Sequence, residues 1–371
     1  MDPKQAIAIN TRRIRAARGM SMVDVAQAAG ITRQALSSIE KGLTQNPRVG
    51  NLQAIAQVLK VPIVDLLAEP PALNTVRFRS KSIKSGKDEA RKQQYLVDTA
   101  FWLDNFNSLQ ELLNDKKQYK LDSVPDQLNA PDPIKAAQFA REALDLKDDE
   151  PIGDIVGLME SAGIKVKARE FALKNFFGFS VAAVDGGPAV VVNASKDITV
   201  ERMIFTVAHE LGHLLLHPHA YDPTKSTEND LEEDQANCFA GHFLMPQSAF
   251  DKKMNESYGL GYIDKIMHIK RFFGVSYQTV LRRWIEMNVA TPKDLYMKFN
   301  RLYQNRFGKS LKKTEEPAGL EEFDFVEDYL RMLIRKALDK GLITVSRAAE
   351  ILSVSLDEMR QIINSWADAA A

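Results

Sequence analysis

The stretch FTVAHELGHLLLH, residues 205–217, contains the pattern HExxH. Its apolar residues recur at helical spacing, which predicts a helix that is buried along one side. On such a helix His209 and His213 lie one turn apart on the same face, so both imidazoles can bind one metal ion. Glu210 lies about 100° further around the helix and can hold a water molecule bound to that metal. The stretch therefore predicts a zinc site with Glu210 as its general base.

A catalytic zinc site needs a third protein ligand, and the predicted helix that follows offers one. The stretch EEDQAN begins at Glu232, and in it Glu233 and Asn237 share a helix face at i and i+4. Glu233 can complete a His2Glu site, and Asn237 can brace a ligand histidine. Glu232 and Asp234 are then expected to point away, into a solvated first turn. Such a site would hydrolyse a peptide bond, with the base passing a proton from water to the leaving amine.

Several side chains near these motifs keep more than one interpretation. The candidates for a group that stabilises the oxyanion are His217, His219, Tyr221 and His242. His217 also continues the i+4 series, where it either competes as a ligand or lies beyond the metal and caps the helix. Cys238 fits a small buried residue better than a metal or redox role.

A second motif lies near the N-terminus, in RGMSMVDVAQAAGITRQALSSIEKG at residues 18–42. Ser21 begins a predicted helix, Gly30 makes the turn, and a second helix starts behind its cap residue, Thr32. This is the spacing of a helix-turn-helix, whose second helix reads double-stranded DNA in the major groove. The predicted DNA contacts on the polar side of that helix are Thr32, Arg33, Gln34, Ser37 and Ser38.

The distribution of charge decides between two interpretations of this motif. Residues 1–66 carry nine basic and four acidic side chains, a net charge of +5. A helical bundle that contacts only protein would show the same spacing, but the positive charge favours DNA. The whole chain is neutral, with 49 basic and 49 acidic residues, because residues 222–234 hold six acids and one lysine. Neutrality thus excludes a uniformly basic protein and does not exclude a basic DNA-binding end.

Length and composition set further limits. The 371 residues with 45% hydrophobic content predict two or three globular domains. A single cysteine excludes a disulfide framework within the chain and a cysteine-rich zinc knuckle. No run of 18 apolar residues and no secretory signal occur. We therefore expect a cytoplasmic protein with no membrane contact.

The rest of the pattern predicts an α+β chain that is mostly α. Strands are predicted at 164–168, 178–184 and 189–193, with a hairpin turn at 185–188. The stretch LITVSRAAEILSVSLDEMRQII, residues 342–363, repeats the helix-turn-helix spacing. Its second helix carries two acids and one arginine, which favours protein contact or dimerisation over DNA binding.

Both motifs resemble known families. Residues 9–67 resemble the XRE, lambda-repressor-like helix-turn-helix family, although Met22 stands where that family usually has a glutamine that touches the DNA backbone. The two stretches around the predicted zinc site, with the preceding PIGDIVGLMESAGIKV, GFSV and PAVVVNASKD, resemble the ImmA/IrrE zinc metallopeptidases over about residues 134–290. Together with the N-terminal motif and VRFRSKS at 76–82, the resemblance spans most of the chain. Gln235 departs from the acid that many members have there, and the ligand position is intact.

The resemblance implies an organisation and a function. The expected parts are a lambda-repressor-like domain at 1–69, a basic linker and helix at 70–133, a zincin-like peptidase domain at 134–290 and a C-terminal helical, helix-turn-helix-like domain at 291–371. It implies a homodimeric DNA-binding regulator with a gluzincin-like endopeptidase that uses Zn2+. The implied substrate is a helix-turn-helix repressor or the chain itself, in a stress, mobile-element or toxin–antitoxin-like response.

Alternatives to this function stay open. Constitutive and latent peptidases both fit the sequence. So do a non-proteolytic sensor, whose peptidase-like domain binds a ligand or nucleic acid, and a peptidase whose helix-turn-helix binds only protein. If the chain is a peptidase, we expect its extended substrate to pair with the sheet edge near residues 177–182.

Overall fold

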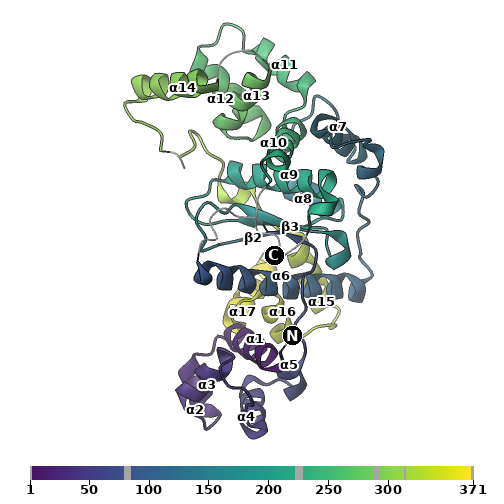
Figure 1. Ribbon diagram of the computed structural model, residues 1–371, viewed down its shortest axis with the longest axis vertical. Coiled ribbons are helices and arrows are strands. Elements are labelled where there is room, and N and C mark those ends of the chain that lie inside the picture. The colour runs from purple at the N-terminus through teal and green to yellow at the C-terminus, as the bar shows by residue number, and fades with distance from the viewer. Residues whose placement is uncertain (1, 79–84, 222–228, 288–291, 313–314, 369–371) are drawn as a thin grey trace. The chain divides into compact units, whose positions relative to one another are not determined.

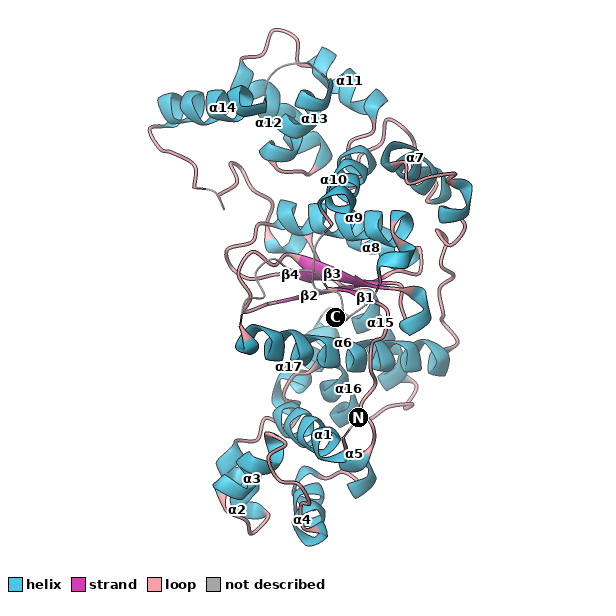
Figure 2. Cartoon of the chain, viewed as in Figure 1, coloured by secondary structure: helices cyan, strands magenta, loops and turns pink. Residues whose placement is uncertain are grey.

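The computed structural model describes residues 2–78, 85–221, 229–287, 292–312 and 315–368. These residues are mostly helical and contain one four-stranded sheet (Figure 2), so the expected α+β, mostly α fold is confirmed. No described helix combines the length and the apolar character that a membrane span requires. The chain forms two compact units, each built from segments distant in sequence. The four sequence-based domain boundaries remain predictions.

The first unit comprises Met1–Ala72, Gln93–Asp115 and Leu330–Ala371. Its N-terminal helices, labelled in Figure 1, are α1 (Pro3–Ala17), α2 (Met22–Ala28), α3 (Arg33–Glu40), α4 (Val49–Leu59) and α5 (Ile63–Leu67). Helix α2 begins behind Ser21, which forms a capping box with Asp24. Gly30 makes the turn at φ +66°, a conformation that a side chain disfavours. The predicted helix-turn-helix is therefore present.

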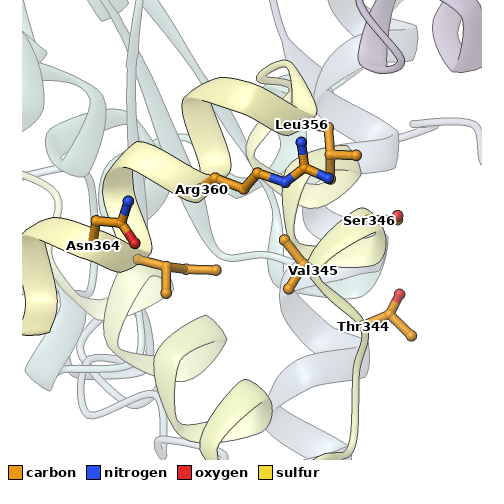
Figure 3. Close-up of a pocket in the computed structure, with 7 residues that line it drawn as sticks. Thr344, Val345, Ser346, Leu356, Arg360 and Asn364 are labelled. Atoms are coloured by element: carbon orange, nitrogen blue, oxygen red, sulfur yellow. The ribbon is translucent and has the colours of Figure 1, made fainter.

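The remainder of the first unit is also helical. It contains the later part of α6 (Gly86–Leu113), α15 (Tyr329–Asp339), α16 (Val345–Leu352) and α17 (Leu356–Asp368), and α16 and α17 form a helical hairpin. Ser353 joins α16 to α17 in a left-handed conformation, and Met359 of α17 is fully buried. A pocket of about 460 Å3 lies between these two helices, lined by Val345, Leu356 and Arg360 among others (Figure 3).

The second unit comprises Leu73–Lys92 and Lys116–Tyr329. Its α-helices beyond the start of α6 are α7 (Pro133–Ala143), α8 (Ile155–Ser161), α9 (Val200–Leu216), α10 (Asp230–Leu244), α11 (Gln247–Glu256), α12 (Tyr262–Phe273), α13 (Tyr277–Met287) and α14 (Pro292–Phe307). Single 3-10 turns lie at η1 (Pro125–Gln127), η2 (Ala183–Asp185), η3 (Pro218–Ala220) and η4 (Glu322–Asp324). One large apolar core joins α7–α10 to the sheet.

The sheet has the strand order β1-β3-β4-β2. Its strands are β1 (Val76–Arg77), β2 (Lys165–Arg169), β3 (Gly178–Val181) and β4 (Ala189–Asn193). The predicted hairpin pairs β3 with β4, while β2 runs parallel to β4. Strand β4, one of the two central strands, is buried along its whole length, and α9 packs against this sheet. The predicted strand over 178–184 is three residues too long, since the chain enters η2 after Val181.

Candidate metal centre

Helix α9 carries the HExxH pattern through the core of the second unit. Thr199 caps it by accepting a hydrogen bond from the Arg202 N–H, and most of the helix is buried. Helix α10 crosses α9 closely at Gly212, where an added Cβ would lie 2.9 Å from the Phe239 ring. The missing side chain at Gly212 therefore lets α10 bring its first turn beside the two histidines.

The structure brings the three predicted metal ligands together. The Nε2 atoms of His209 and His213 are 3.0 Å apart, and the Glu233 carboxylate oxygens lie 3.3 Å from His209 Nε2 and 3.5 Å from His213 Nε2. Tetrahedral zinc with bonds of about 2.0–2.1 Å separates its ligand atoms by about 3.3 Å. These three residues form a possible metal-binding group whose spacing fits a zinc ion.

Hydrogen bonds assign the tautomers of the two histidines. The Gln235 Oε1 atom accepts from the Nε2–H of His217 at 2.9 Å, so His217 Nδ1 accepts in turn from the Nδ1–H of His213 at 2.9 Å. The Nδ1–H of His209 donates to Asn237 Oδ1 at 3.1 Å. Burial lowers the pKa of His213 and of His217 and so favours their neutral forms. Both His209 and His213 therefore present a free Nε2 lone pair.

The Glu210 side chain lies under strand β3. It is buried, and Ser180 Oγ donates to its Oε2 at 2.6 Å. Because that hydrogen is used, the Tyr221 hydroxyl donates to Ser180 Oγ at 2.9 Å. Burial raises the pKa of Glu210, and burial also raises the pKa of Tyr221, which keeps the tyrosine protonated. A chain of two hydrogen bonds thus holds the predicted base.

The four candidates for oxyanion stabilisation have different surroundings. Tyr221 donates to Ser180, and His217 belongs to the hydrogen-bond chain of His213. His242 Nε2 lies 3.1 Å from a guanidinium nitrogen of Arg283. His219 is exposed. His217 also ends α9, where its N–H donates to the His213 carbonyl, as expected for a residue beyond the metal.

Arg77 is a residue of this site for which the sequence predicted no role. It lies on β1, is 4% exposed, and donates from Nη2 to Glu232 Oε2 at 3.1 Å and to Glu233 Oε1 at 2.9 Å. Glu232 is therefore tied to a buried cation, whereas the sequence predicted a solvated side chain. A weak signal was present, since Val76 and Phe78 alternate around Arg77 as in a strand.

The sheet edge expected to receive substrate is partly occupied. Strand β1 pairs with β3 at Ser180 and Val181, and β4 pairs with the other edge of β3. A strand has only two edges for main-chain pairing. The Ala182 N–H also donates to the Thr75 carbonyl at 3.0 Å. The expectation that substrate pairs along residues 177–182 is therefore wrong at residues 180–182.

The predicted DNA contacts lie on α3 and at its cap. Thr32, Arg33 and Gln34 are exposed, while Ser37 and Ser38 are half-buried. Thr32 Oγ1 accepts the Ala35 N–H and so caps the helix. On the other side of α3, Glu40 forms an ion pair with Arg15 of α1 at 2.6 Å. Met22, which departs from the family pattern, packs against the core of this domain.

Comparison with known proteins agrees with both motifs. Residues 12–66 match the family model described as helix-turn-helix, and residues 159–284 match the one described as IrrE N-terminal-like domain. A search of curated proteins found no match. The chain is therefore a fusion of an XRE-type helix-turn-helix domain with a peptidase-family domain of the IrrE N-terminal-like type.

Proposed function

We propose that the chain is a DNA-binding regulator with a zinc-dependent endopeptidase, which cleaves a helix-turn-helix repressor or the chain itself. The observation that carries the enzymatic part is the spacing of the ligand atoms of His209, His213 and Glu233, 3.0–3.5 Å, beside the buried Glu210. The family match supports a metallopeptidase-like domain. A domain that had lost catalysis would have no need of a base in this position.

The residues of the site suit peptide hydrolysis. When bound, zinc would supply a Lewis acid that polarises the substrate carbonyl and acidifies a water molecule. Glu210 is placed to accept a proton from the attacking water and would later give it to the leaving amine. Ser180 holds the Glu210 carboxylate through its 2.6 Å hydrogen bond, and Tyr221 holds Ser180. Burial of Glu210 raises its pKa, which makes it a stronger proton acceptor than an exposed carboxylate.

The DNA-binding part rests on α3 and on charge. Arg33 and Gln34 are exposed at the start of α3, and arginine and glutamine suit the edges of guanine and adenine respectively. The net charge of +5 over residues 1–66 adds attraction to phosphates. We propose a homodimer that binds two operator half-sites, as helix-turn-helix proteins do.

One preparation tests the enzymatic proposal. We expect bound zinc in the wild-type chain and none in Glu233→Ala, while Asp234→Ala, the exposed neighbour on α10, keeps its zinc. We expect Glu210→Gln to keep zinc and to lose at least about 100-fold of the cleavage rate on a helix-turn-helix repressor or on the chain itself. A wild-type chain without zinc would refute the peptidase, and equal cleavage by Glu210→Gln would refute the base.

The second candidate is the non-proteolytic sensor, which one cavity favours. It has a volume of about 670 Å3 and is lined by Phe177, Asn193 and Arg202 among others. The Arg202 guanidinium lies 3.8 Å from the centre of the Phe177 ring and forms no ion pair with any described residue. The volume is typical of a small-molecule pocket. Zinc binding without cleavage of any repressor offered, or of the chain itself, would favour this function.

A further inference from the structure

Two neighbouring carboxylates could each supply the third ligand of the proposed metal centre. Glu232 and Glu233 both lie in the first turn of α10 and both touch Arg77. Only one of them can be the third ligand if a fourth position is to stay open for water. The contacts of each carboxylate show what separates them.

Glu232 is held by both of its oxygens. Its Oε2 accepts from Arg77 Nη2 at 3.1 Å, and its Oε1 accepts from the side-chain amide of Asn229 at 3.1 Å. Glu233 accepts from Arg77 through Oε1 alone, and its Oε2 is 3.3 Å from His209 Nε2. The same guanidinium nitrogen therefore ties back one carboxylate and orients the other.

Strand β1 fixes the position of Arg77. Its neighbours Val76 and Phe78 are at most 1% exposed, and the Phe78 ring stacks on Phe176 with centres 4.5 Å apart. Because side chains alternate along a strand, this anchoring turns Arg77 to the other face. That face is the one of Ser180, its partner on β3, whose hydroxyl binds Glu210.

Electrostatics favours the charged guanidinium at this place. Burial works against the charge of Arg77, but Glu210, Glu233 and Glu232 raise its pKa above the ordinary value overall. Without Arg77, the carboxylates of Glu210, Glu232 and Glu233 would lose the buried cation that they share. Glu232 would then lose its ion pair with the guanidinium and be drawn to a bound metal ion.

We propose that Arg77 is a positioning residue that makes Glu233, and not Glu232, the carboxylate ligand of the metal centre. This inference rests on the proposed zinc peptidase. It also assigns to the site a residue from outside the region that matches the peptidase family, which begins at residue 159. The metal centre therefore depends on the short segment that follows the first 72 residues of the chain.

The proposal can be tested by the visible absorption spectrum of the chain with cobalt in place of zinc. Tetrahedral Co2+ absorbs visible light more strongly than five- or six-coordinate Co2+. We expect at least about a two-fold fall in absorption for Arg77→Met, as Glu232 joins the metal. The double variant Arg77→Met/Glu232→Gln should recover the wild-type spectrum, and Glu232→Gln alone should keep it. Arg141→Met is the matched control, because Arg141 is buried like Arg77 but donates only to main-chain carbonyls among the described residues.

Activity gives a second readout. In the zinc-loaded chain Arg77→Met should lower kcat by about 10–100-fold with little change in KM, and Glu232→Gln in that background should restore it. An Arg77→Met spectrum equal to that of the wild type, or a double variant without recovery, would overturn the role of Arg77. If Arg77→Met does not fold, the double variant, which removes one charge of each sign, decides by its spectrum. A wild-type chain that takes up neither Co2+ nor Zn2+ would instead sink the proposed function.

Discussion

Helices α9 and α3 carry the two motifs of the chain, and the polar side chains of these motifs differ in their exposure to solvent. Fifteen of the 17 residues of α9 are buried, including Glu210 and His213, whereas only three of the eight residues of α3 are. Helix α3 keeps Leu36 and Ile39 inside and leaves Arg33 and Gln34 in solvent. The same local geometry thus serves a hidden site in one case and a surface in the other.

The difference follows from what each site has to do. A base and a metal ligand gain strength where water is excluded, because burial moves the pKa and fixes the tautomer. Side chains that read DNA must reach into a groove, so their donors stay exposed and only the helix beneath them needs a rigid support. For α3 that support includes the ion pair between the half-buried Arg15 and the buried Glu40. The two helices should therefore respond to different perturbations.

Removal of the metal should produce the largest difference between the two sites, in cleavage on the one hand and in DNA binding on the other. We expect a chelator to abolish cleavage and to leave salt-dependent operator binding in a gel shift unchanged, because the proposed metal ligands on α9 and α10 belong to the second unit and α3 belongs to the first. Added Zn2+ should restore cleavage. Loss of DNA binding on chelation would show that the two sites are not independent.

Loss of one exposed arginine should have the opposite effect, on DNA binding and not on cleavage. We expect Arg33→Ala to weaken operator binding by about 1–3 kcal/mol, roughly 5–150-fold, and to leave the cleavage rate unchanged. Its control is Arg360→Ala on α17, the second helix of the similar C-terminal hairpin, where Arg360 pairs with Asp357 at 2.9 Å. A comparable loss of DNA affinity in Arg360→Ala would contradict the assignment of α3 as the reading helix.

Much of both helices could be predicted from the sequence, since each motif is local. The spacing of His209 and His213 on one turn needs no tertiary information, and Glu233 could be proposed because an acid stood in the next predicted helix. The cap residues Ser21 and Thr32 also indicated where α2 and α3 begin, and the structure has both caps. Short-range spacing was enough for these features.

What spacing could not supply is contact between distant segments. Arg77 reaches the proposed metal centre from a strand of only two residues, within the part of the chain that the sequence predicted as a basic linker and helix. The bond of His217 to Gln235 depends on how α10 crosses α9 at Gly212. Pairing of β1 with β3, which occupies part of the expected substrate edge, is likewise a tertiary contact.

The smallest predicted effect concerns the threonines that begin the two helices. Thr32 accepts the Ala35 N–H at 3.1 Å and Thr199 accepts the Arg202 N–H at 3.3 Å. We expect each Thr→Ala change to lower the free energy of unfolding of its unit by about 1 kcal/mol in denaturant titrations. Each Thr→Ser change should leave most of that stability in place, because serine also caps helices.

The two caps should nevertheless differ in function. Thr32 is exposed at the start of the reading helix, so Thr32→Ala should also weaken operator binding, whereas Thr199→Ala should not. If both variants lose stability equally and only Thr32→Ala loses DNA affinity, then exposure, and not capping, distinguishes α3 from α9. If Thr199→Ala weakens DNA binding as much, the second unit influences the reading helix, and the independence of the two helices is wrong.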